Sequence, residues 1–276
     1  MLTTITPFWG RAEALTRWRE AVNAWPHPDV RHLLVNYSAP GEFELDSVVE
    51  NFSEIKLPQP TDGVRSIGDC LNAGALATST KWMMKLDLDM VVHDGLWDAV
   101  VGMITSGSSD WYNLGTFYLT RRISQRLDEE PVSKARHSQL AEAVFSGRPG
   151  VTTRRLGGIQ FICTVVDYLA VGGTDPLFRG YGWEDYATAY SLNRLSAKPR
   201  AISHVTPSTS CAVIRDELLE PMANELFAKD RRLAVLHHQH EPSVKTHGAA
   251  DPNAYKCPTR MAANKYRVYE LVNSHQ

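Results

Sequence analysis

The chain has 276 residues, of which 43% are hydrophobic and 22% are charged, and its formal net charge at pH 7 is −2. These values are ordinary for a globular protein, and the length allows one large α/β domain or two smaller lobes. A nearly neutral chain has no overall basic field to recruit nucleic acid or an anionic membrane, although local basic pairs such as Arg121-Arg122 exist.

The sequence lacks the features of a membrane-spanning or secreted chain. No apolar run approaches the length that a bilayer requires, and residues 1–7 predict a short strand rather than a secretion signal. The cysteines lie far apart without a CxxC pair, which favours reduced thiols over disulfides or zinc: Cys70, Cys163, Cys211 and Cys257. We therefore expect a cytoplasmic protein with no membrane span.

Strand-like and helix-like segments alternate through the first hundred residues. Apolar runs predict strands at 2–5, 32–36, 55–57 and 82–86. Apolar residues at helical spacing predict helices at 12–25 and 66–78. This β-α-β alternation predicts an α/β fold with a mostly parallel sheet flanked by helices on both faces.

The remaining sequence is less regular. Strands are expected at 111–119 and 158–164, and helices at 138–145, 184–195 and 214–229. The highly charged stretch 124–136 predicts an exposed excursion, and 247–266 predicts a loop followed by a terminal helix. Since no long Pro/Gly/Ser tract separates the two halves, we expect them to share one sheet.

Two aspartates follow the strand predicted at 82–86. Asp87 and Asp89 stand two residues apart where ligands bind in open α/β sheets, outside the carboxyl ends of the strands. Alternation along an extended chain would point both carboxylates the same way, toward a hard cation such as Mn²⁺ or Mg²⁺. Such a cation would bridge the two phosphates of a nucleotide-sugar. The structural alternative is a solvated strand end carrying two ordinary aspartates.

A second constellation combines glycines, aromatic residues and paired acids. Gly157-Gly158 opens a strand, and the stretch 178–185, FRGYGWED, ends in Glu184 and Asp185. Glycines let a backbone approach a ligand closely, aromatic rings stack on sugar faces, and adjacent acids can orient and deprotonate a hydroxyl. The alternative is that both acids simply place negative charge at a helix N-terminus.

The order of these motifs, GG…YLAVGG…FRGYGWEDY after a DxD, resembles the inverting GT-A-fold glycosyltransferases, especially β-1,4-galactosyltransferases and bacterial chondroitin polymerase. The resemblance implies a single GT-A-type domain over 1–276. Residues 1–92 would form its nucleotide-sugar-binding half, and 93–276 its acceptor-side half with a C-terminal extension.

The resemblance also implies roles for individual residues. Asp185 corresponds to the catalytic base and Glu184 to an acid that contacts the acceptor. Asp87 and Asp89 correspond to the metal-binding DxD. Residues implied in nucleotide-sugar binding are Pro7, Arg11, Arg65, Asp87, Gly158, Tyr181 and Trp183.

A histidine cluster at 237–240 is the candidate source of a further metal ligand. Neutral imidazole suits Mn²⁺ alongside carboxylates, and chondroitin polymerase has a similar His-Gln-Glu-Pro run. His238 matches best because Gln239 follows it, with His240 second and His237 third. The alternative is a cluster of surface histidines.

The sequence therefore predicts a metal-dependent inverting glycosyltransferase that moves a sugar from a nucleotide-sugar, expected to be a UDP-sugar, to an acceptor hydroxyl. The acceptor is left open among a glycan, a small molecule and a modified nucleobase, since Tyr186 replaces a further acid of the galactosyltransferases. Two alternatives stay open: a nucleotidyltransferase or nucleotide-sugar hydrolase with the same DxD, and a non-catalytic carbohydrate-binding protein.

Overall fold

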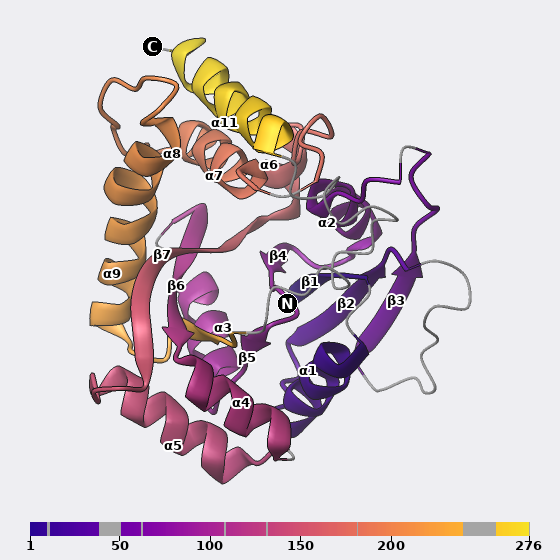
Figure 1. The fold of residues 1–276 in the computed structure, drawn as a ribbon, viewed down its shortest axis with the longest axis vertical. Coiled ribbons are helices and arrows are strands. Elements are labelled where there is room, and N and C mark those ends of the chain that lie inside the picture. The colour runs from indigo at the N-terminus through magenta and orange to yellow at the C-terminus, as the bar shows by residue number, and fades with distance from the viewer. Residues whose placement is uncertain are drawn as a thin grey trace.

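The computed structural model places helices on both sides of a mixed sheet (Figure 1). Within the described residues this sheet has eight strands in the order β3-β2-β1-β4-β7-β6-β8-β5. The structure describes residues 1–9, 12–38, 51–61, 63–107, 109–130, 132–180, 182–239 and 258–275.

Parallel strands form the first half of the sheet. They are β1 (Leu2–Phe8), β2 (Val30–Asn36), β3 (Phe52–Lys56) and β4 (Trp82–Lys85). Helix α1 (Ala12–Ala24) connects β1 to β2, and α2 (Ile67–Ala77) connects β3 to β4. The β-α-β alternation expected from the sequence is confirmed.

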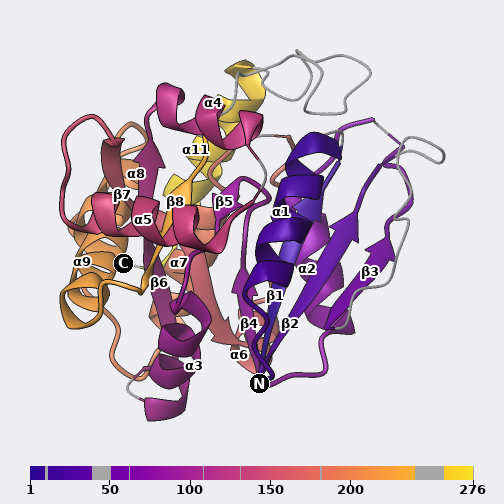
Figure 2. The ribbon, with the colours of Figure 1, turned by 90° about the horizontal axis from the view of Figure 1, so that it is seen from below.

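The two faces of these strands are covered by different helices (Figure 2). Because side chains alternate along a strand, Leu2 packs in one core cluster with Trp18 of α1. Ile5 packs on the other face with Leu71 of α2. A glycine at 74 permits this close approach, since a Cβ there would lie 2.4 Å from Cγ2 of Ile5.

The second half of the sheet mixes strand directions. The long β7 (Thr152–Thr164) runs antiparallel to both β4 and β6 (Trp111–Leu119). Next, β8 (Ala234–His237) runs parallel to β6, and β5 (Met90–Val91) runs antiparallel to β8. Four of the seven pairings in the described sheet are parallel, and the two halves share one sheet, as expected.

The helices of the second half lie on both sides of these strands, and α11 is the last element of the chain (Figure 1). Helix α11 lies beside α7 and α8, whereas α4 and α5 lie at the opposite end of the molecule. The helical segments are α3 (Leu96–Ser106), α4 (Arg121–Glu129), α5 (Lys134–Phe145), α6 (Val165–Ala170), α7 (Glu184–Leu195), α8 (Ser210–Val213), the π-helical η1 (Ile214–Leu219), α9 (Glu220–Lys229) and α11 (Pro258–Asn273).

The prediction of an exposed excursion over 124–136 is wrong. Residues 124–129 belong to helix α4, in which Ser124 and Leu127 are buried and the charged residues are exposed. The stretch is charged because an amphipathic helix with a narrow apolar stripe presents most of its residues to solvent.

Two further observations bear on the class of protein. No helix in the described part of the chain is long and apolar enough to cross a membrane. Cys70, Cys163 and Cys211 are buried free thiols, and Cys257 lies outside the described residues.

Candidate active site at the end of β4

The DxD aspartates lie in a turn between β4 and β5, where the backbone N–H of Met90 donates to the carbonyl of Asp87 at 3.1 Å. The expectation that both carboxylates point the same way assumed an extended strand, in which side chains alternate. A turn does not follow this alternation. The two side chains accordingly have different neighbours. Asp87 contacts residues of β4 and β7, whereas Asp89 lies beside β8.

Lys85 connects the DxD to the paired acids. It ends β4 with only 1% of its side chain exposed, and its Nζ lies 2.7 Å from Oδ2 of Asp87 and 3.3 Å from Oδ2 of Asp185. Burial alone would lower the pKa of this ammonium, but the carboxylates of Asp185 and Asp87 outweigh burial and raise the pKa. Lys85 is therefore a fixed cation between two carboxylates that are far apart in the sequence.

Gln160 of β7 holds Asp87 from the other side. Its Nε2 donates to Oδ2 of Asp87 at 2.8 Å, and its Oε1 accepts from the Asp87 backbone N–H at 3.2 Å. Gln160 is itself buried, so both polar ends of its side chain use this one residue as partner. The conformation of the turn at Asp87 is thereby tied to the central strand of the sheet.

Glu184 and Asp185 open α7 and are almost completely buried, with 4% and 6% of each residue exposed. Burial raises the pKa of both carboxyl groups, and for Asp185 the nearby Lys85 opposes this rise. Oε2 of Glu184 and Oδ1 of Asp185 have no hydrogen-bond partner in the described protein. Unsatisfied buried acceptors are costly, so these two oxygens are suited to receive hydrogen bonds from a bound molecule.

The loop before α7 has an unusual backbone. Gly180, Gly182 and Trp183 all have positive φ, at 75°, 103° and 79°. For a tryptophan this left-handed conformation costs on the order of 1–3 kcal/mol, so the surrounding structure must impose it. Asn264 of α11 supplies part of that restraint, because its Nδ2 donates to the carbonyls of Arg179 and Gly182, each at 3.2 Å.

A buried hydrogen-bond network fixes the start of α7 from behind. The side chain of Asn72 in α2 bonds both the N–H and the carbonyl of Thr174, at 2.9 and 2.8 Å. The Tyr168 hydroxyl lies 2.8 Å from Asn72 Oδ1 and 3.0 Å from Thr174 Oγ1, so it can donate its proton to one of them. Thr174 Oγ1 lies 2.9 Å from Thr188 Oγ1, and the Thr188 hydroxyl donates to the carbonyl of Glu184. The paired acids thus sit on a rigid support.

The structure brings His237, rather than His238, to the side chain of Asp89. His237 Nε2 lies 3.7 Å from Asp89 Oδ1, and its ring stacks on Tyr118 at 4.3 Å. His238 Nε2 instead lies 2.9 Å from the carbonyl of Ser124 and 3.1 Å from Oδ1 of Asp128, both in α4. His240 lies outside the described residues.

The other residues implied in nucleotide-sugar binding are spread along the chain. Pro7 pairs with Val35 within the sheet, and buried Arg65 donates to Oε1 of Gln59 at 2.9 Å. Gly158 lies in β7 close to a shift in the β6–β7 register. Arg11 and Tyr181 lie outside the described residues.

No group of three or more His, Cys, Asp or Glu side chains within the described ranges is arranged to hold a metal ion. Asp89 and His237 form a pair of suitable donor types, and Asp87 lies in the same turn. Carboxylate and imidazole suit Mn²⁺, and phosphate oxygens of a bound nucleotide commonly complete the coordination of such an ion. The residues present fit a site that a bound diphosphate would complete.

Sequence reasoning missed Lys85 and Gln160, although both carried a signal. Lysine is rarely buried without a charged partner, and Lys85 ends an otherwise apolar strand two residues before Asp87. Gln160 is likewise a polar residue in the apolar stretch that follows Gly158. In each case a polar residue inside a predicted buried strand marks a place where another polar group must meet it.

No protein-family model matches the chain, and no curated protein matches it in sequence. Among solved structures, the chain is similar to the mannosyltransferase PcManGT from Pyrobaculum calidifontis in complex with GDP-Man and Mn²⁺. That match has 10% identity over 99% of this chain and 73% of the other, with a TM-score of 0.44.

Two further solved structures are similar at the same level. S. aureus TarS 1-349 has 11% identity over 100% of this chain and 92% of the other, with a TM-score of 0.46. Glucosyl-3-phosphoglycerate synthase from Mycobacterium tuberculosis, in complex with Mn²⁺, UDP and glucosyl-3-phosphoglycerate, has 13% identity over 84% and 80%, with a TM-score of 0.44. All three matches are weak in both identity and superposition.

Proposed function

We propose that this chain is a metal-dependent inverting glycosyltransferase of the GT-A type that uses a nucleotide-sugar, a UDP-sugar in the first instance. One observation carries the proposal. The two motifs of the sequence resemblance, 98 residues apart at Asp87 and Asp185, meet at the buried ammonium of Lys85. In this proposal residues 1–92 bind the nucleotide-sugar and 93–276 form the acceptor side.

Asp185 is the proposed catalytic base. Lys85 holds its Oδ2, which leaves Oδ1 as the oxygen that takes the proton from an acceptor hydroxyl. A base is most effective when its pKa lies near the working pH, and burial moves the Asp185 pKa upward in that direction. Attack on the anomeric carbon from the face opposite the leaving group gives inversion, as the resemblance implies.

Glu184 is the proposed acceptor-orienting residue. Its Oε2 is buried and has no partner among the described residues, so it can accept a hydrogen bond from a second hydroxyl of the acceptor. Holding the acceptor hydroxyl beside the base makes the reaction effectively unimolecular, and this loss of entropy before the reaction is among the largest contributions to catalysis. The two neighbouring acids thus have separate tasks.

The charge of the site explains why a cation is needed. Asp87, Glu184 and Asp185 all act on the Lys85 ammonium, and Asp89 adds a fourth carboxyl group in the same turn as Asp87. This excess of acid would repel a diphosphate. When bound, Mn²⁺ or Mg²⁺ would supply positive charge to the departing diphosphate. We propose Asp89 and His237 as its protein ligands with Asp87 beside them, so that His237 takes the place first expected for His238.

The function is tested with a panel of nucleotide-sugars scored by thermal shift with and without Mn²⁺. A ligand that binds only the folded state stabilises it by mass action, about 2.7 kcal/mol at a hundredfold excess over its Kd. The expected result is metal-dependent stabilisation by at least one nucleotide-sugar, lost in Asp89→Ala. The proposal is overturned if none of the panel raises the melting temperature.

The ligand assignment is tested by calorimetry with Mn²⁺ and UDP. His237→Ala should weaken Mn²⁺ binding more than His238→Ala, because only His237 contacts the Asp89 side chain. A larger effect of His238→Ala would restore the sequence-based ranking. Donor consumption without any added acceptor would favour the nucleotide-sugar hydrolase or nucleotidyltransferase, and binding without turnover would favour the carbohydrate-binding protein.

A further inference from the structure

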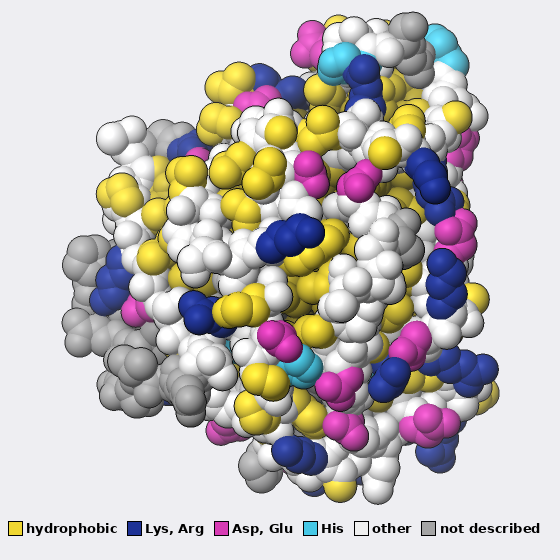
Figure 3. Space-filling model, turned by 180° about the vertical axis from the view of Figure 1, so that it is seen from behind, with side chains coloured by type: hydrophobic (Ala, Val, Ile, Leu, Met, Phe, Trp, Pro, Cys, Tyr) yellow, Lys and Arg dark blue, Asp and Glu magenta, His cyan; other side chains and the backbone are white. Residues whose placement is uncertain are grey.

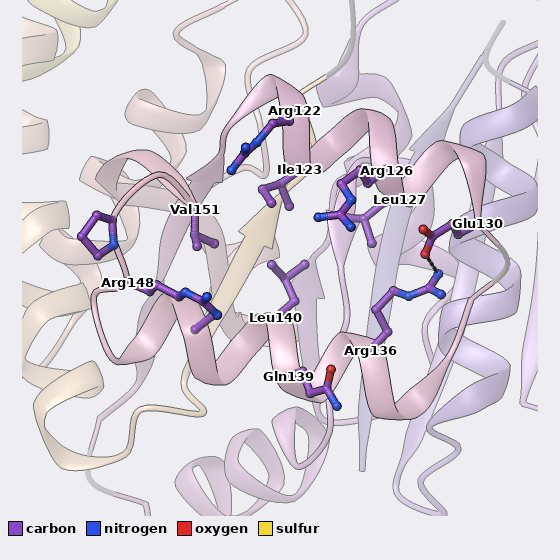
Figure 4. A pocket seen from close by; sticks show the side chains of 12 residues that line it. Arg122, Ile123, Arg126, Leu127, Glu130, Arg136, Gln139, Leu140, Arg148 and Val151 are labelled. Atoms are coloured by element: carbon purple, nitrogen blue, oxygen red, sulfur yellow. Dashed lines mark ion pairs between the residues drawn. The ribbon is translucent and has the colours of Figure 1, made fainter.

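A cavity of about 450 Å³ lies between α4 and α5, outside the candidate active site. Figure 4 shows Arg122 and Arg126 from α4 and Arg148 from the segment after α5 around its mouth, with Leu140 of α5 inside. Its size lies within the range of small-molecule sites, roughly 300–1,000 Å³.

The arginines of this cavity have little internal charge to balance them. Arg136 pairs with Glu130, but Arg122, Arg126 and Arg148 have no side-chain hydrogen bond or ion pair within the part of the chain that the structure describes. Four arginines against one glutamate leave a local charge of +3 on a chain whose net charge is −2.

This gathering of positive charge differs from the distribution of charge on the face of the molecule seen in Figure 3. On the face seen in Figure 3, basic and acidic side chains are interspersed. Arginines presented from three chain segments, two helices and a loop, create a concave positive field that concentrates anions. Guanidinium groups bind phosphate and carboxylate oxygens through paired N–H donors.

The floor of the cavity is apolar. Leu127 and Val151 are buried in a small core cluster, and Ile123, Leu140 and Ala143 pack against it while also lining the cavity. A bare inorganic ion would leave this surface in contact with water. An apolar body attached to the anion would cover it, at about 25 cal/mol per Å² removed from water.

The cavity is separated from the candidate active site by α4 itself. Ile123, Arg126, Leu127 and Glu130 follow helical spacing and line the cavity. Ser124 and Asp128, four residues apart, form a different face of the helix that contacts His238. The arginines therefore do not belong to the site around Asp89.

We propose that the cavity between α4 and α5 is a binding site for a small phosphate monoester with an apolar body. The phosphate would lie among Arg122, Arg126 and Arg148, and the apolar part would lie on Ile123 and Leu140. This site is independent of the proposed glycosyl transfer, and its occupancy can be measured without any turnover.

The test uses phenyl phosphate as the probe and calorimetry on the full chain. Inorganic phosphate and phenol, which carry only the charge or only the ring, should both bind more weakly than phenyl phosphate. Arg126→Gln and Arg148→Gln should each weaken phenyl phosphate binding about 10- to 100-fold, as expected for loss of a charge-assisted hydrogen bond.

The matched control is Arg194→Gln, an exposed arginine on α7 that makes the same change in charge far from the cavity. It should leave phenyl phosphate affinity unchanged. Equal affinities for wild type, Arg126→Gln and Arg148→Gln would overturn the proposal, as would absence of phenyl phosphate binding. Equal affinities for inorganic phosphate and phenyl phosphate would show that the apolar floor does not contribute to binding, and would overturn the proposal of a ligand with an apolar body.

Discussion

The site around Lys85 and the cavity between α4 and α5 place charge in opposite ways. Around Lys85, acids and an ammonium are buried together, and contacts within the protein set their positions. Between α4 and α5, arginines are exposed, and three of them lack a described internal partner. Buried charge must be matched by the fold itself, whereas exposed charge of one sign is available for a ligand.

The largest effect expected in the acidic region is on catalysis. Asp185→Asn keeps the size of the side chain but removes its ability to take a proton, so the transfer rate should fall about 10²- to 10⁴-fold. Donor affinity should change little, because the base acts on the acceptor. Transfer rate and donor affinity are measured once a donor and acceptor are found.

Glu184→Gln is the matched variant for Asp185→Asn, since it removes the neighbouring charge with equally little change in volume. It should act chiefly on acceptor affinity, because Glu184 is proposed to hold the acceptor. An Asp185→Asn protein that turns over within a few-fold of wild type would contradict the assignment of the base.

The contrast between buried and exposed charge predicts very different costs for removing one cation. Lys85→Met leaves Asp87 and Asp185 facing each other without their ammonium, which should lower the free energy of unfolding by about 3–5 kcal/mol. Arg126→Gln in the cavity should change it by less than about 0.5 kcal/mol. Denaturant unfolding measures both.

Lys198→Met serves as the control for Lys85→Met, because Lys198 is exposed and the substitution removes the same groups. If Lys85→Met unfolds at the same denaturant concentration as Lys198→Met, the buried ion pairs do not stabilise the fold. The contrast between the two regions would then lose its energetic basis.

The buried imidazole of His32 predicts that the free energy of unfolding falls in acid. Burial lowers the pKa of His32 from its ordinary 6.5 to about 4, so the unfolded chain binds a proton more readily than the folded one. Stability contributed by neutral His32 is present above about pH 6.5 and is lost as pH falls toward 4, by at most about 3 kcal/mol.

The measurement for this prediction is the free energy of unfolding as a function of pH in wild type and His32→Gln. The slope between pH 4 and 6.5 should be shallower in His32→Gln. Exposed His204 provides the control, and His204→Gln should keep the wild-type slope. Equal slopes in all three proteins would show that His32 is not the source of the acid sensitivity.

Among the residues that contact Asp87, a smaller effect than that of Lys85 is expected for Gln160, whose side chain is an uncharged amide. Gln160→Met keeps the length of the side chain but leaves the Asp87 N–H and Oδ2 each short of one bond, which should cost about 1–3 kcal/mol. Chemical denaturation measures the loss. A cost as large as that of Lys85→Met would mean that hydrogen bonding, not charge, organises the turn.

Much of the fold could be predicted from periodicity. The strand at 111–119 and the helix at 184–195 were expected with the bounds observed, because long periodic segments carry strong signals. Strands β5 and β8, of 2 and 4 residues, were not expected, since segments this short show no period of their own. Strand β8 forms by pairing with β6 and β5, and β5 forms by pairing with β8.

The candidate site could be predicted only in part, because a motif identifies residues but not the contacts that they make in the folded chain. The motifs identify Asp87 and Asp185, but only the folded chain shows that Lys85 lies between them. His238 ranked first because Gln239 follows it in the sequence, but His237 ends β8 and His238 is the next residue, and consecutive side chains of an extended chain point to opposite sides. His237 therefore faces Asp89, and His238 faces α4.

The pairing of β5 with β8 also has a consequence for the order of events during synthesis. Met90 pairs with His237, so the aspartate and histidine proposed to share a metal come together only after 148 further residues have been translated beyond Asp89. At roughly 5–20 residues per second, the ribosome takes about 7–30 s over that stretch. During this interval β5, which follows the turn that carries the aspartates, lacks the strand with which it pairs in the described sheet. The nascent chain can therefore pair the first parallel strands well before it can capture a cation.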